Sequence, residues 1–124
     1  MILVDTSVWV DHLRAGDPAL TTQLNAAQVL GHPFVTGEIA MGNLKARDVV
    51  LADLQDLPQA IVANDIEVLQ FVERAALSGL GLGYIDAHLL ASARLTPNSA
   101  LWTRDKRLAE AAEKLGLTPK PPIR

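Results

Sequence analysis

Four acidic residues are candidates for chemistry because of where they fall in the sequence. Each follows a short apolar run or a turn, and each stands at a predicted strand end or helix start; the four are Asp5, Glu38, Asp86 and Asp105. In open parallel sheets the strand ends meet in one crevice, so residues far apart in sequence can converge there. Carboxylate oxygens suit Mg²⁺ or Mn²⁺, which activate water for attack on phosphate esters.

Helix capping is the competing explanation for the same four acids. A carboxylate at a helix start accepts hydrogen bonds from free backbone amides and interacts favourably with the helix dipole. Hydroxyl side chains can also cap helices, and they already stand beside the acids at Thr6, Ser7, Thr36 and Thr103. Four carboxylates in one crevice would repel one another, and a divalent cation would reverse that interaction.

The sequence excludes several other kinds of site. It has no cysteine, and its three histidines lack the spacing of a zinc motif. The turn GLGLGY follows a predicted helix and does not have GxGxxG spacing, and neither a Walker A loop nor a GxSxG elbow is present. Three basic residues flank the fourth acid and are candidates either for RNA-phosphate contacts or for solvated helix charge: Arg104, Lys106 and Arg107.

The composition predicts one globular domain over residues 1–124. Hydrophobic residues make up 49% and charged residues 20%, and the net charge of −3 gives no strong basic surface. The first apolar stretch contains Asp5 and Asp11 and lacks a basic start, so no signal peptide is predicted. No apolar run approaches the length of a membrane span, and we expect a cytoplasmic protein with no membrane contact.

The elements that must position the acids alternate between strands and helices. Strands are predicted at 2–4, 32–36, 58–63 and 100–103, and the tail at 117–124 is a further edge candidate. Helices are predicted at 7–14, 17–30, 37–44, 46–57, 64–77, 85–95 and 104–116, with Asp17 and Asn64 as N-caps. This order predicts an α/β fold with a small, mostly parallel sheet of four or five short strands covered on both faces.

Four segments together resemble the PIN-domain family, and most closely the toxins of the VapC type from bacterial toxin–antitoxin pairs. They are DTSVWVDHL, EIAMGNL, GLGYIDAHLLASA and LWTRDKRL, in this order along nearly the whole chain. The resemblance implies a three-layer α/β/α sandwich and an endoribonuclease dependent on Mg²⁺ or Mn²⁺. It implies a homodimer, held inactive by a small cognate antitoxin whose tail covers the site, and structured RNA such as transfer RNA or a ribosomal RNA loop as substrate.

The resemblance also assigns roles to residues. The acidic positions of the family fall on Asp5, Glu38, Asp86 and Asp105, and its hydroxyl positions fall on Thr6 and Thr103. Some PIN domains carry a fifth acid shortly after the fourth, but here Lys106 and Arg107 follow Asp105. This departure puts a second metal site in doubt, and we expect Asp5 and Asp86 to be the main ligands.

Two other functions are compatible with the residues. The first is a non-catalytic, dimeric α/β binding module whose acids only cap helices. The second is a magnesium-dependent phosphatase, although such enzymes carry a second acid two positions after the first, where this chain has Ser7.

Overall fold

The computed structural model describes all residues 1–124 and contains a three-stranded, entirely parallel sheet. The strands are β1 (Ile2–Val4), β2 (Val29–Leu30) and β3 (Ala100–Trp102), in the order β2-β1-β3. The register pairs Leu3 with Leu30 on one side and with Leu101 on the other. The central strand β1 therefore lies between two neighbours whose ends point in the same direction.

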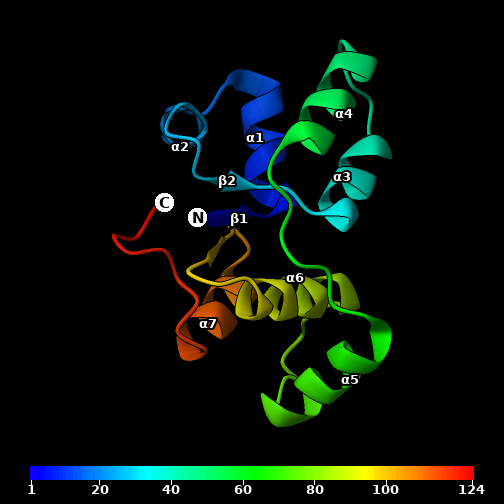
Figure 1. Ribbon diagram of the computed structural model, residues 1–124, viewed down its shortest axis with the longest axis vertical. Coiled ribbons are helices and arrows are strands. Elements are labelled where there is room, and N and C mark those ends of the chain that lie inside the picture. The colour runs from blue at the N-terminus through cyan, green and yellow to red at the C-terminus, as the bar shows by residue number, and fades with distance from the viewer.

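Seven helices cover the two faces of this sheet. In Figure 1, α1 to α4 lie on one side of the sheet and α5 to α7 on the other, which confirms the predicted α/β class. None of the helices combines the length and the apolar character that a membrane span requires. The helices are α1 (Thr6–Ala15), α2 (Pro18–Asn25), α3 (Pro33–Ala40), α4 (Arg47–Asp56), α5 (Asp65–Arg74), α6 (Tyr84–Leu95) and α7 (Lys106–Lys114).

The core lies between the sheet and helices on both faces. Leu3 and Val4 of β1 are fully buried, which explains why the first strand is an unbroken apolar run. Residues 87–93 of α6 are all buried, among them the polar His88 and Ser92, so this part of the helix is buried around its whole circumference and not along one stripe. The start of α6, and with it Asp86, is consequently held in a fixed position against the sheet.

The predicted number of strands was wrong. The segment 32–36 belongs to α3, whose first turn is formed by Pro33 and capped by His32. The second strand instead lies at Val29–Leu30, within the segment predicted as the end of a helix. Of the segment 58–63, only Gln59 makes a bridge to Gly31, and no strand forms in the tail after residue 116.

Several predicted helix boundaries agree with the structure. Asp17 accepts the amide hydrogen bond of Leu20 at the start of α2, and Asn64 forms a capping box with Glu67 at the start of α5. The helix predicted for 64–77 ends earlier, at Arg74, so Gly79 belongs to the following turn and is not a helix cap.

Candidate active site

Asp5 stands at the end of the central strand and is also the N-cap of α1. Its backbone amide continues the sheet by donating to the Trp102 carbonyl (2.9 Å). Its Oδ2 accepts hydrogen bonds from the Ser7 hydroxyl (2.7 Å), the Ser7 amide (3.3 Å) and the Thr103 hydroxyl (2.8 Å). Asp5 is buried, and three donors on one oxygen fix the orientation of its carboxylate.

The end of β3 brings the fourth acid to the same place. The register pairs Val4 with Trp102, so Thr103 directly follows the strand next to Asp5. The Thr103 Oγ1 that donates to Asp5 also accepts from the amide of Asp105 (3.1 Å). Asp105 caps α7, because its Oδ1 accepts from the Leu108 amide (3.0 Å).

Asp86 reaches the same group from the first turn of α6. Its Oδ2 accepts from the Gly83 amide (3.0 Å) just before the helix. Burial raises the pKa of Asp86, the hydrogen bond from Gly83 opposes the rise, and the charges of Asp5 and Asp105 add to it. Asp86 is therefore close enough to Asp5 and to Asp105 for each of these carboxylates to repel it.

Glu38 lies on α3 and is linked to the group through Thr6. Its Oε1 accepts from the Thr6 hydroxyl (2.7 Å), and Thr6 follows Asp5 directly in sequence. Because α3 already begins at Pro33, Glu38 lies in the second turn of this helix and not in the first turn, as the sequence suggested. It is exposed, in contrast to Asp5.

The four carboxylates share one property that bears on their function. In each of them one oxygen accepts a hydrogen bond and the other has no hydrogen-bond partner in the protein; the bound oxygens are Oδ2 of Asp5, Oε1 of Glu38, Oδ2 of Asp86 and Oδ1 of Asp105. The hydrogen bonds of these acids, including the helix-capping ones, thus leave one oxygen of each carboxylate free for a ligand. The two explanations of these acids are compatible.

The donor set fits a hard divalent cation in its chemistry. All four side chains offer a carboxylate oxygen, and repulsion between three of them would be relieved by a cation. As the side chains stand, no three carboxylates or imidazoles lie close enough together to hold a metal ion. Asp86 is thus close enough to Asp5 and Asp105 to feel their charges. Glu38 is linked to this group through its hydrogen bond with Thr6.

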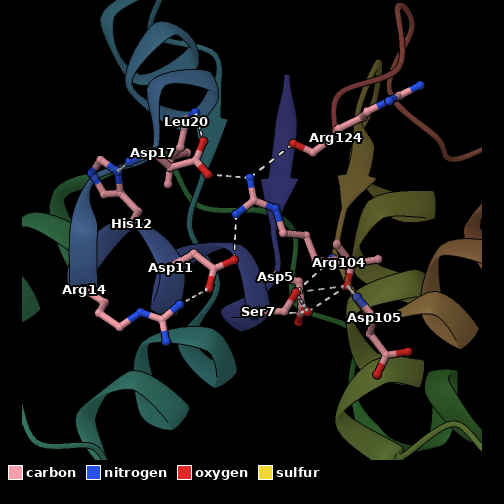
Figure 2. A network of polar contacts seen from close by, with 11 residues as sticks. Asp5, Ser7, Asp11, His12, Arg14, Asp17, Leu20, Arg104, Asp105 and Arg124 are labelled. Carbon is pink, nitrogen blue, oxygen red and sulfur yellow. Dashed lines mark hydrogen bonds and ion pairs between the residues drawn. The ribbon is translucent and has the colours of Figure 1, made fainter.

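Arg104, a candidate either for an RNA-phosphate contact or for solvated helix charge, has partners within the protein. Its guanidinium lies between Asp11 of α1 and Asp17 before α2, and also donates to the Arg124 carbonyl (Figure 2). The two carboxylates raise the pKa of Arg104, and the hydrogen bond from Arg104 lowers the pKa of Asp17. In this arrangement Arg104 joins two helices and the chain end, and it is not free to bind phosphate.

Lys106 and Arg107 remain available for a phosphate. Neither forms an ion pair with an acidic residue, and both are exposed. The guanidinium of Arg107 lies against Gly81, where any side chain would collide with it. Gly81 also has a φ of +77°, so the glycine in this turn both shapes the backbone and makes room for Arg107.

The sequence indicated Ser7 as an alternative cap and as a departure from the phosphatase pattern, but not as a partner of Asp5. Its hydroxyl donates to Asp5 and accepts from the Arg104 amide (3.0 Å), so it connects the ends of β1 and β3. A hydroxyl two residues after an N-cap acid can reach that acid, and this spacing was the signal available in the sequence.

Comparison with known proteins agrees with this geometry. A family model described as PIN domain matches residues 2–114. Ribonuclease VapC32 of Mycobacterium tuberculosis, in strain CDC 1551 / Oshkosh and in strain ATCC 25618 / H37Rv, is 50% identical over 117 residues, covering 94% of this chain and 94% of the relative. No solved structure matches the chain. The chain belongs to the PIN-domain family and, within it, to the VapC type.

Proposed function

We propose that the chain is a metal-dependent endoribonuclease that acts as the toxin of a toxin–antitoxin pair. The observation that carries the proposal is the group of four carboxylates around the ends of β1 and β3, each with one oxygen hydrogen-bonded and one oxygen without a protein partner. The name of the relative, Ribonuclease VapC32, supports the same activity.

Asp5 and Asp86 are the proposed main ligands of Mg²⁺ or Mn²⁺, and Glu38 and Asp105 complete the site directly or through water. When bound, the cation supplies charge neutralisation and a more acidic water for in-line attack on the phosphodiester. Ser7 and the proposed site hydroxyl Thr103 hold the Asp5 carboxylate in one orientation.

The other proposed residues surround these acids. The second site hydroxyl, Thr6, positions Glu38 through its hydrogen bond. Lys106 and Arg107 hold the RNA phosphates next to the cleaved bond, and Arg104 contributes to the architecture instead. The substrate of the proposed reaction is RNA, and the reaction cleaves the RNA chain.

The proposed partners are a cognate antitoxin and a second copy of the chain, with the cytoplasm as the place of action. Met41, which is 88% exposed, and Ile66, which is 69% exposed, are large apolar side chains that such a partner could bury.

RNA cleavage by the purified protein tests the proposal. We expect cleavage with Mg²⁺ and none with EDTA, and we expect Asp5→Asn and Asp86→Asn to lose it. Asp48→Asn is a matched control, because Asp48 is an exposed first-turn acid on α4 outside the group. Undiminished cleavage by both site variants would show that these carboxylates are not the catalytic group.

A further inference from the structure

Tyr84 lies at the surface at the start of α6, the helix that also carries Asp86. It is the first residue of α6, two residues before Asp86, and it is 49% exposed. About half of this aromatic residue is therefore accessible to solvent in the helix turn that carries one of the four acids.

The ring of Tyr84 is fixed in its position by two contacts. Its hydroxyl donates to Asp65 Oδ1 at the start of α5 (3.0 Å). Its ring packs edge-on to His88, with 4.7 Å between centroids and an angle of 88° between planes, and His88 in turn packs against Phe34. His88 is buried, and its Nε2 lies 3.4 Å from the same Asp65 Oδ1, so the two rings and this carboxylate form one cluster. An exposed ring that is already ordered loses little freedom when it binds a ligand.

One acidic and one basic residue lie near this end of α6. The hydroxyl of Tyr84 contacts Asp65, whose side chain is 80% exposed and would repel a phosphate. Arg107 lies against Gly81, three residues before Tyr84, and has no carboxylate partner. The turn from Gly81 to Tyr84 thus has an unpaired cation at its start and an exposed aromatic ring at its end.

We propose that Tyr84 forms a subsite for one unpaired nucleobase of the RNA, which stacks on the ring while Arg107 holds a neighbouring phosphate. This inference rests on the proposed ribonuclease function. Every base has a face that can stack on an aromatic ring, and a base inside a continuous duplex has no free face. The subsite therefore selects loops and single strands over paired RNA, independently of the base.

Fluorescence of 2-aminopurine in RNA tests the subsite without cleavage. The probe is an RNA hairpin with 2-aminopurine in its loop, titrated in EDTA, with a fully paired duplex for comparison. We expect the parent protein and Tyr84→Phe to quench the loop probe. We expect Tyr84→Leu to lose the quenching and to bind about tenfold more weakly, as the loss of one stacked base predicts. Val49→Ala is the control, because Val49 is an exposed apolar residue on α4.

The outcomes separate this inference from the proposed function. Failure of the parent protein to quench the loop probe, equal quenching by Tyr84→Leu, or equal binding of the duplex overturns the subsite. Cleavage assays on Asp5→Asn in Mg²⁺ are independent of these results. Loss of cleavage in Asp5→Asn together with unchanged stacking in Tyr84→Leu would refute the subsite alone. Retained cleavage in Asp5→Asn together with lost stacking in Tyr84→Leu would refute the catalytic role of the carboxylates alone.

Discussion

Asp86→Asn is expected to raise the melting temperature of the metal-free protein. Burial and the charges of Asp5 and Asp105 raise the pKa of Asp86 above its usual 3.8. A raised carboxyl pKa means that ionisation costs more in the folded chain than in the unfolded one. The stability from this group is present below pH 3.8 and is lost as the pH rises through the folded pKa. Removing the charge therefore stabilises the folded protein at neutral pH.

The size of the effect follows from the contacts of Asp86. Asparagine keeps an oxygen that can accept the hydrogen bond from the Gly83 amide. The substitution therefore loses only the additional stability that a charged acceptor gives at a helix start, about 0.3–1.5 kcal/mol. Because the pKa is raised in spite of this hydrogen bond, the gain from removing the charge exceeds that loss. Each pKa unit corresponds to about 1.4 kcal/mol, or roughly 5 °C in Tm for a domain of this size.

Thermal scans by circular dichroism in EDTA and in Mg²⁺ provide the measurement, with Glu67→Gln as the matched control. Glu67 has the same capping-box position on α5 and accepts from the Asn64 amide (3.0 Å), but it is exposed and outside the carboxylate group. We expect Glu67→Gln to melt slightly lower than the parent. Mg²⁺ should stabilise the parent by about 2.7 kcal/mol at one hundred times its Kd, and Asp86→Asn much less. If Asp86→Asn in EDTA also melts lower, by the amount seen for Glu67→Gln, Asp86 is only a cap.

Three further predictions concern other parts of the molecule. Burial lowers the pKa of His32 from 6.5 to about 4, so its contribution to stability is present above pH 6.5 and is lost toward pH 4, by about 3 kcal/mol in all. His32→Asn keeps an oxygen that can cap α3, and it should show a smaller difference in the free energy of unfolding between pH 7.5 and pH 5, measured with urea. A difference as large as that of the parent protein would show that His32 is not the group that titrates. Arg104→Gln should reduce the free energy of unfolding by about 1–2 kcal/mol, because Arg104 pairs with two carboxylates. Arg14→Gln, at an exposed ion pair, should reduce it by less than about 0.5 kcal/mol. Equal losses would show that the contacts of Arg104 stabilise the fold no more than an exposed ion pair does. Ser7→Ala and Thr103→Val should lower RNA cleavage by about 10–100-fold because Asp5 loses its orienting donors, and full activity in both would exclude that role.

The strands show where sequence patterns were sufficient and where they were not. The first and third strands were predicted because each is a short apolar run buried on both faces. The second strand was missed because α2 ends at Asn25 and the chain turns through Ala27 at a φ of +54°, where no glycine marks the turn. The helix at Pro33 was mistaken for a strand, although a proline preceded by a capping side chain is a helix-start signal.

The candidate site was predictable as far as it depends on topology. Asp5 and Asp105 follow strands that turned out to be parallel neighbours, so their approach followed from the order of elements. The contacts of Arg104 were not predictable from the sequence, because its partners Asp11 and Asp17 are about ninety residues away in the chain and approach it only in the folded protein. Local charge patterns do not reveal which cation is already paired.

The question of cap or ligand has a structural answer in this fold. In a parallel α/β protein a strand end is followed at once by a helix start, so an acid at the site edge is automatically in a capping position, as Asp5 and Asp105 are. The cap uses one oxygen and restricts the rotation of the side chain, while the other oxygen stays without a protein partner. A carboxylate already fixed in this way loses less side-chain entropy when a cation binds. Capping would therefore prepare these acids for the proposed metal binding, and a rise in melting temperature of Asp86→Asn in EDTA would show that capping is not the whole role of Asp86.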